Sequence, residues 1–283
     1  MLKNLQKFYY PKSTDEAVTI LSEQGARATV VAGGTTLARL DNPQLETVVD
    51  ISRCGLSYIK EDKEGLHIGA TTTFQDLVRS ETAQKFAGGL VSKSSGMVST
   101  RLVRNAGTVG GDIVYNYSYN DLPPVFLALD AKVSILEKGS ERWVDFAEFS
   151  VKHGTLIVGR TGLLKEVLIP QKAKNWRSSY QRFARSFSDW EAQIIVATAL
   201  GFKDNTCDSA RIAAGCIVQH PVRVTEAENA VLGDSPDIKS FEKAADLFCK
   251  KIEPMADWRS SKDYRKEVLK TLVRRSLQEC RQG

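Results

Sequence analysis

The sequence lacks the closely spaced side chains that build metal centres and disulfide frameworks. Its 283 residues include three histidines and five cysteines, and no two cysteines form a C-x-x-C pair. Iron–sulfur clusters and structural zinc sites draw on clustered thiolates, and disulfide frameworks use an even number of cysteines. The thiols are Cys54, Cys207, Cys216, Cys249 and Cys280. We therefore expect five ordinary thiols and no metal site within this chain.

Long apolar runs are also absent. No stretch approaches the roughly 18 apolar residues needed to span a bilayer, and the first residues, MLKNLQKFYYPKS, contain no hydrophobic core of a secretory signal. These absences predict a cytoplasmic protein without a membrane span. The formal net charge is +5, and the charges near the C-terminus alternate in sign along a predicted helix. Such alternation is typical of a solvated face and argues against nucleic-acid binding.

Length and composition indicate a globular protein with more than one domain. A chain of 283 residues with 42% hydrophobic and 26% charged residues suits two or three subdomains. The segment 171–179, QKAKNWRSS, is basic and polar and follows a proline, so we predict a boundary there. Helices and strands alternate before this boundary. The part after it reads as a compact α+β unit.

Hydrophobic periodicity predicts the individual elements. Predicted helices cover residues 14–24, 74–79, 83–99 with a glycine break at 88–89, 224–232, and a tail whose apolar positions run from Tyr264 to Leu277. Predicted strands cover residues 28–32, 47–51, 66–71, 131–136, 155–159, 163–169, 192–202 and 210–218. By pattern alone, 192–202 also fits a helix. Ser13 and Thr73 are predicted N-caps, each followed by an acid three residues later.

The first glycine pair ends a predicted buried strand. In 30-VVAGGTTL-37 the strand leads to Gly33 and Gly34, where glycine permits φ > 0 and lets a ligand approach the backbone. Successive amides in such a corner can bind anionic oxygens, and Thr35 and Thr36 add hydroxyl donors. The segment is neither a Walker loop nor the G-x-G-x-x-G fingerprint. A tight turn without a ligand is the alternative.

The second glycine pair repeats these ingredients. In 105-NAGTVGGDI-113, Thr108 precedes Gly110 and Gly111, and Asp121 follows ten residues later. A carboxylate near a phosphate-binding loop often accepts hydrogen bonds from ribose hydroxyls. Two such corners and one acid suit a ligand with two phosphates and a sugar. The hypothesis is therefore a dinucleotide held from two sides, and two coincident turns are the alternative.

Five ordered motifs in the first part of the chain resemble the FAD-binding subunit of the molybdenum hydroxylases, a family that includes xanthine dehydrogenase and aerobic carbon monoxide dehydrogenase. They are VAGGTTL, IGATTTFQDL, RNAGTVGGDI, NDLPPVFLALDAKV and EVLIP. The segments 215–233 and 258–277 are similar to that family's terminal domain. The resemblance covers nearly the whole chain, which makes it far more specific than either glycine pair alone.

The resemblance implies an α+β fold of the vanillyl-alcohol-oxidase or PCMH type. Two α+β subdomains would hold an extended FAD, and a C-terminal α+β domain would close over it. We expect FAD-binding subdomain 1 over residues 1–56, FAD-binding subdomain 2 over 57–172, and the C-terminal domain over 173–283.

The resemblance also implies the residues that contact FAD. Those expected to hold the diphosphate from one side, with the two valines leading in, are Val30, Val31, Ala32, Gly33, Gly34, Thr35 and Thr36. Those expected on the other side are Thr108, Gly110 and Gly111. Asp121 matches the acid that binds the adenosine ribose, Ser99 lies near the FAD-contacting end of the preceding helix, and Leu164 matches an apolar residue packed on the flavin ring.

Two positions depart from the family pattern. The family usually has asparagine where this chain has Asp112, and a carboxylate beside a diphosphate is unfavourable unless it is paired or turned away. The family often has a lysine where this chain has Gln181, with Arg182 and Arg185 as cationic neighbours. The second departure concerns the redox tuning of the flavin and the electron acceptor more than FAD binding.

The function implied by the resemblance is electron transfer by non-covalent FAD, because neither glycine corner contains a histidine or cysteine. No side chain of this chain is expected to be catalytic. Electrons would arrive from [2Fe–2S] clusters on a small partner subunit and leave to NAD⁺, oxygen or a quinone. Molybdopterin would reside on a large partner subunit, with the complex a dimer of heterotrimers. The alternatives are a stand-alone flavoenzyme of the same fold and a scaffold subunit that binds no FAD.

Overall fold

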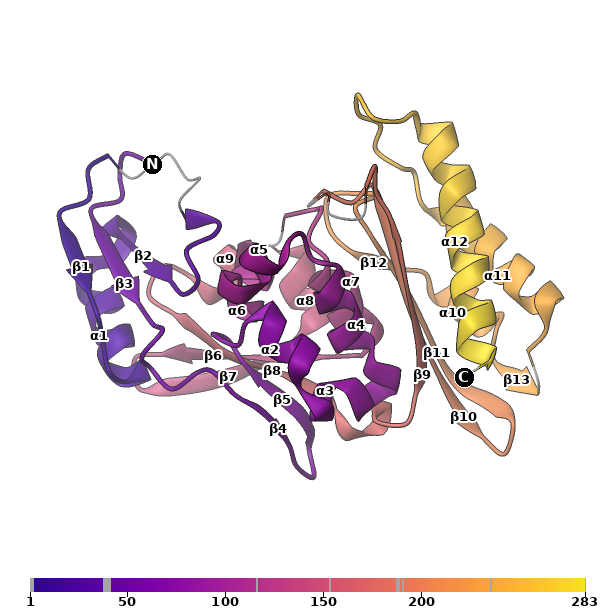
Figure 1. Cartoon of the computed structure of the whole chain (residues 1–283), viewed down its shortest axis with the longest axis horizontal. Helices are drawn as coiled ribbons and strands as arrows, with labels where there is room; N and C mark the ends of the chain where they lie inside the picture. Colours follow the sequence, from indigo (N-terminus) through magenta and orange to yellow (C-terminus); the bar gives the residue numbers. More distant parts are fainter. Residues whose placement is uncertain are drawn as a thin grey trace.

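The computed structural model describes residues 3–37, 42–115, 117–152, 154–186, 189, 191–234 and 236–282. Within these residues three sheets follow one another along the chain. Figure 1 shows them from the indigo N-terminal sheet, through the magenta middle part, to the orange and yellow C-terminal part. We refer to these parts as the N-terminal, middle and C-terminal units.

The N-terminal unit is a small parallel sheet with one helix. Its strands are β1 (Lys7–Tyr9), β2 (Ala28–Val31) and β3 (Thr47–Asp50), in the order β1-β3-β2. Helix α1 (Thr14–Gln24) and the 3₁₀ turn η1 (Gly25–Arg27) connect β1 to β2. The Ser13 hydroxyl accepts the Glu16 N–H, so the predicted cap is confirmed, as are this helix and both predicted strands.

The middle unit is an antiparallel sheet with helices packed on it. The strands are β4 (Ile59–Glu61), β5 (Gly65–Gly69), β6 (Lys132–Glu137), β7 (Ser140–Asp145) and β8 (Leu163–Pro170), in the order β4-β5-β8-β6-β7. The helices are α2 (Phe74–Arg79), α3 (Glu81–Lys85), α4 (Leu90–Met97), α5 (Arg101–Ala106), α6 (Val109–Tyr115), α7 (Leu122–Ala128), α8 (Phe146–Val151) and α9 (Gly154–Val158), with 3₁₀ turns η3 (Phe86–Gly89) and η4 (Gln171–Ala173).

Two sequence-based predictions in this unit need correction. The predicted strand at 155–159 is wrong, because the residues form helix α9. A short apolar run does not by itself distinguish strand from helix, and here Gly154 packs closely on Phe149 and on the Ile113 carbonyl. The predicted helix 83–99 is split into α3, η3 and α4. Ala87, Gly88 and Gly89 all have positive φ, so the break is sharper than predicted.

The C-terminal unit is an antiparallel sheet covered on one face by long helices (Figure 1). Its strands are β9 (Arg177–Phe183), β10 (Ile194–Lys203), β11 (Thr206–Gly215), β12 (Val222–Arg223) and the short β13 (Gly233–Asp234), in the order β12-β11-β10-β9 with β13 beside β11. The helices are α10 (Thr225–Asn229), α11 (Ile238–Lys251) and α12 (Lys262–Gln282).

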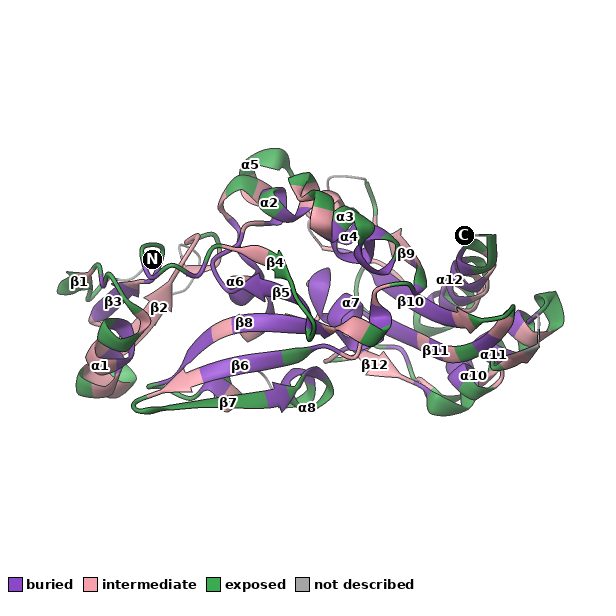
Figure 2. Ribbon diagram, turned by 90° about the horizontal axis from the view of Figure 1, so that it is seen from below, coloured by how far each residue is buried: buried purple, intermediate pink, exposed green. Residues whose placement is uncertain are grey.

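Strand β10 explains the ambiguity of its sequence pattern. Ile194, Val196 and Leu200 pack into the core beneath α11 and α12. Ala197 and Ala199, on the opposite face, join the core of the middle unit. A strand buried on both faces reads as a continuous apolar run, which is why 192–202 also fitted a helix. Figure 2 shows this burial in purple along β10 and along α7, which lies against it.

Candidate functional site

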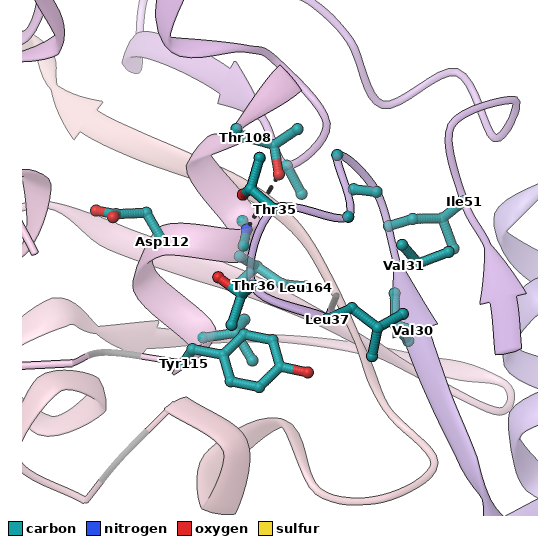
Figure 3. Close-up of a pocket in the computed structure, with 18 of the residues that line it drawn as sticks. Val30, Val31, Thr35, Thr36, Leu37, Ile51, Thr108, Asp112, Tyr115 and Leu164 are labelled. Carbon is teal, nitrogen blue, oxygen red and sulfur yellow. Dashed lines mark hydrogen bonds between the residues drawn. The ribbon is translucent and has the colours of Figure 1, made fainter. Parts of the chain in front are cut away.

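A cavity opens where the N-terminal and middle units meet. It lies between the loop after β2, the first turn of α6 and the start of β8 (Figure 3). The described residues that line it are Val30, Val31, Ala32, Gly33, Gly34, Thr35, Thr36, Leu37, Ile51, Ala70, Phe74, Gly107, Thr108, Gly110, Gly111, Asp112, Val114, Tyr115, Asn120, Val158, Gly162, Leu163 and Leu164. Both glycine pairs therefore lie in one cavity, as the sequence predicts.

The two glycine-containing segments touch backbone to backbone. A Cβ atom on Gly33 would lie 1.6 Å from the carbonyl oxygen of Ala106 at the end of α5. Gly33 is thus required for close approach, whereas Gly34 is required for its backbone conformation, with φ +71°. A Cβ atom on Gly34 would meet only Val31 Cγ2, at 3.8 Å. The first glycine corner forms as predicted, and each of its two positions requires glycine for a different physical reason.

The second glycine pair is not a corner but the first turn of helix α6. The Val109 N–H donates to the Thr72 carbonyl, the Gly110 N–H to the Ala70 carbonyl, and the Gly111 N–H to Thr108 Oγ1. The expectation of free backbone donors at these glycines is therefore wrong. Thr108 Oγ1 accepts one hydrogen bond there, and its hydroxyl donates to no described residue, so it can donate to a ligand.

Free donors are concentrated in the loop after β2. The amides of Gly33, Gly34, Thr35 and Thr36 make no hydrogen bond with any described residue. The hydroxyls of Thr35 and Thr36 belong to the same stretch, and Figure 3 shows both threonines with Thr108 around the cavity. A run of unpaired amides and hydroxyls is suited to anionic oxygens.

The rest of the cavity wall is largely apolar. Val30, Ile51, Val158 and Leu164 contribute aliphatic surface, and the ring of Tyr115 adds an aromatic face. Burial raises the pKa of Tyr115, and a hydrogen bond with Thr29 on β2 offsets part of that rise. The phenol is therefore neutral at physiological pH. A polar wall facing an apolar one suits a ligand that combines charged groups with rings.

Asp112 is the one acid among the described residues that line the cavity, and its carboxylate points away from the cavity in Figure 3. Its Oδ2 accepts the Leu122 N–H at 3.4 Å, and its carbonyl accepts Asn120 Nδ2 at 2.6 Å. Burial, and then the nearby charge of Asp121, raise the pKa of Asp112 well above its usual range. The unfavourable position that the sequence suggested is thus relieved by the orientation of the carboxyl group and by a raised pKa, which favours its neutral form.

Three predicted site residues lie outside this cavity. Asp121, just before α7, is buried and accepts hydrogen bonds from Tyr180 Oη at 2.5 Å and Arg182 Nε at 2.8 Å. Ser99 has φ +40°, and its carbonyl accepts Arg104 Nη1 at 3.0 Å. Gln181 lies on β9, and its Nε2 donates to Ser179 Oγ at 3.4 Å. Their predicted contacts with FAD remain predictions.

Several lining residues were not predicted from the sequence. Ile51 could have been found, because it directly follows β3 and the carboxyl ends of parallel strands meet at one edge. Its N–H donates to the Val31 carbonyl at the end of β2, at 2.9 Å. Tyr115, Asn120 and Val158 come from α6, the connection after it, and α9, and no local signal marks them.

Among the described residues, no group of three or more histidine, cysteine or acidic side chains is arranged to hold a metal. Within the same ranges, no helix is both long and apolar enough to cross a membrane.

Comparison with known families assigns the class of protein. Residues 3–172 match the family described as the FAD binding domain in molybdopterin dehydrogenase. Residues 178–280 match the CO dehydrogenase flavoprotein C-terminal domain. The chain therefore belongs to the FAD-binding medium-subunit family of the molybdenum hydroxylases and is a flavoprotein subunit of an oxidoreductase.

Individual relatives agree with this assignment over nearly the whole chain. The carbon monoxide dehydrogenase medium chain of Hydrogenophaga pseudoflava is 28% identical, covering 96% of this chain and 95% of that one. The 6-hydroxypseudooxynicotine dehydrogenase complex subunit alpha of Paenarthrobacter nicotinovorans is 28% identical, covering 94% and 90%. A solved carbon monoxide dehydrogenase from Hydrogenophaga pseudoflava superposes with a TM-score of 0.91 at 28% identity, covering 99% of this chain and 98% of the other.

The contact at Gly33 leads to a paired stability test. Gly33→Ala should lower the free energy of unfolding by about 1–3 kcal/mol or more, because its methyl group collides with a backbone carbonyl. Gly34→Ala should lower the free energy of unfolding by only about 1–2 kcal/mol, because alanine is strained in the left-handed conformation. Thermal and denaturant unfolding of both variants measures the difference. If Gly34→Ala is the more damaging change, backbone contact with Ala106 is not the governing constraint.

The raised pKa of Asp112 predicts a pH-dependent gain for Asp112→Asn. The unfolded chain releases this proton near the ordinary value of 3.8, and the folded chain holds it to higher pH. Wild-type stability therefore falls as pH rises through this window, by up to about 1.4 kcal/mol per pH unit. Asp112→Asn should be more stable than wild type at pH 7–8 and equal to it near pH 4. A difference at Asp112 that is independent of pH would contradict the assignment.

Proposed function

We propose that the cavity between the N-terminal and middle units is the FAD site of an electron-transfer subunit. The observation that carries this proposal is the stretch of unpaired amides and hydroxyls at 33–36, opposite an apolar wall. Asp112 supports it as well, because its carboxylate turns away and so leaves the donor-rich wall free of opposing charge. The cavity residues thus fit a ligand with a diphosphate and aromatic rings.

Each part of the cavity has a role in this proposal. The backbone of Gly33 to Thr36 and the hydroxyls of Thr35, Thr36 and Thr108 bind the diphosphate. Leu164 and Tyr115 pack against a ring and exclude water from it. Binding is non-covalent, since the described lining residues include no histidine or cysteine. Bound FAD supplies both one- and two-electron chemistry, which the side chains of this cavity do not.

The proposal extends to partners and domains. Electrons reach the FAD from [2Fe–2S] clusters of a small subunit, molybdopterin resides on a large subunit, and NAD⁺, oxygen or a quinone accepts the electrons, in a cytoplasmic dimer of heterotrimers. Names such as "medium chain" and "FAD-binding subunit" among the relatives support an assembly of several subunits. The three sheets support domains at 1–56, 57–172 and 173–283.

Reconstitution with FAD tests the cavity directly. The purified chain should bind FAD and show the visible absorbance of a bound flavin. Thr36→Val removes one hydroxyl donor at nearly constant volume, and the loss of about 1 kcal/mol should weaken binding roughly fivefold. Thr82→Val, on helix α3, is the matched control and should leave the dissociation constant unchanged. If wild type binds no flavin, or if Thr82→Val weakens binding as much as Thr36→Val, the cavity is not the FAD site.

Isolation from the native cell tests the assembly. The tagged chain should co-purify with two further subunits, one containing molybdopterin and one containing iron and acid-labile sulfide. The mass of the complex should correspond to two copies of each subunit. Recovery of an active flavoprotein that contains this chain alone would instead favour a stand-alone flavoenzyme.

A further inference from the structure

Helix α7 forms the seam between the middle and C-terminal units. All seven of its residues, Leu122 to Ala128, are buried. It packs on β10 and β11, and Figure 1 shows it facing the C-terminal sheet. A Cβ atom on Gly215 at the end of β11 would lie 3.0 Å from Pro124 Cγ, so the sheet approaches this helix closely.

An acid next to each end of α7 binds arginines of the C-terminal sheet. Next to the first turn, Asp121 accepts Arg182 Nε of β9 at 2.8 Å. Beyond the last turn, Asp130 accepts Arg211 Nε and Nη2, both at 2.9 Å, and Arg223 Nη1 at 2.7 Å. The helix is therefore tied to the C-terminal sheet at both ends by charged hydrogen bonds, which are directional.

The two ends differ in charge balance. Around Asp130, which is 18% exposed, Lys172 joins the two arginines. Burial opposes ionisation there, but hydrogen bonds from Arg211 and Lys172 hold the pKa of Asp130 below its usual range. At the other end the side chains of Arg182 and Asp121 are only 2% and 4% exposed.

Around Asp121, a single guanidinium faces two carboxyl groups. Burial raises the pKa of Asp121, and Arg182 offsets only part of that rise. Asp112 lies close enough for the charge of Asp121 to raise its pKa as well. The remaining hydrogen-bond donor to Asp121 is the neutral Tyr180 hydroxyl. Among the described residues, the charge of Asp121 is thus balanced by Arg182 alone.

Asp121 connects directly to the cavity wall. Its neighbour Asn120 lines the cavity and donates Nδ2 to the Asp112 carbonyl at 2.6 Å. Asp112 Oδ2 in turn accepts the Leu122 N–H at 3.4 Å. Residues 112 and 120–122 are therefore held together by short-range bonds, and the buried ion pair attaches this group to β9. The second branch of Arg182, Nη2, donates to the Asp189 carbonyl at 2.5 Å and is fixed by it.

We propose that Arg182 is a positioning residue for the cofactor site: from the C-terminal sheet it anchors Asp121 and so fixes the wall formed by Asp112 and Asn120. This inference rests on the proposed role of the cavity as the FAD site. Arg182 does not line the cavity, so it acts through Asp121 and not by touching the ligand. FAD affinity then depends on a residue of the C-terminal unit.

Arg182→Met and Arg211→Met form a matched pair for the full-length chain. Each removes a guanidinium that binds an acid at one end of α7, but only Arg182 is connected to the cavity wall. Arg182→Met should raise the dissociation constant of FAD roughly 5- to 150-fold, the usual range for coupling between a ligand site and a second position. Arg211→Met should lower the melting temperature and leave the FAD dissociation constant unchanged. Equal losses of affinity in both variants would mean a general structural role and would overturn the proposal.

Hydrogen exchange of the protein without FAD supplies a readout that does not depend on the ligand. Amides in the ranges 112–115 and 120–122 should exchange faster in Arg182→Met than in wild type, and no faster in Arg211→Met. Unchanged exchange in Arg182→Met would refute the anchoring role even if wild type bound no FAD. In that case the failure of FAD binding counts against the proposed function, and the exchange result counts separately for or against Arg182.

Two further variants guard against misfolding of Arg182→Met. Arg182→Lys keeps the positive charge but replaces the two-branched guanidinium with a single ammonium group. Its FAD dissociation constant and its amide exchange rates should therefore lie between those of wild type and those of Arg182→Met. Wild-type behaviour of Arg182→Lys would overturn the need for the two-branched guanidinium. Adding Asp121→Asn to Arg182→Met removes the buried carboxylate that the first change leaves without its guanidinium, and should recover part of the thermal stability that Arg182→Met loses. Absence of any recovery would contradict the charge balance on which the proposal depends.

Discussion

A backbone contact between the loop after β2 and the end of α5 holds the cavity together. Gly33 lies where a Cβ atom would be 1.6 Å from the Ala106 carbonyl oxygen. The loop belongs to the parallel N-terminal sheet and Ala106 to the middle unit, so this contact joins two units that have separate sheets. The donors at 33–36 line the cavity and belong to the same loop that makes this contact. Protein interiors transmit such local packing constraints because they are close-packed.

The two glycine pairs look alike in sequence but meet different physical demands. The first ends a strand and leaves four successive amides unpaired among the described residues. The second begins a helix, and its amides are bonded to Ala70 and Thr108. Gly110 is needed there because a Cβ atom would lie 2.8 Å from the Ala70 carbonyl oxygen. One pair therefore supplies unpaired donors, and the other lets helix α6 pack closely on Ala70, just after β5.

Features that depend on short sequence distances could be predicted. The Ser13 and Thr73 caps bond to residues three positions away, and both are present. The cavity segments 30–36 and 108–112 were marked by glycine and threonine. Tyr115 and Val158 carry no such mark, because they reach the cavity through the placement of α6 and α9. The partner of Asp121, Arg182, is 61 residues away, and no spacing rule reveals such a pair.

The C-terminal unit is joined to the FAD-binding units by more than one kind of interaction, and the kinds have different consequences. Ala197, Ala199 and Ala213 belong to the same hydrophobic core as the middle unit. Their small side chains allow close approach, but apolar contact is non-directional and does not fix where α7 sits along the sheet. Ion pairs at both ends of the helix are directional and fix that register. The C-terminal unit is therefore a continuation of the cofactor-binding body, and the geometry of the cavity depends on residues that do not line it.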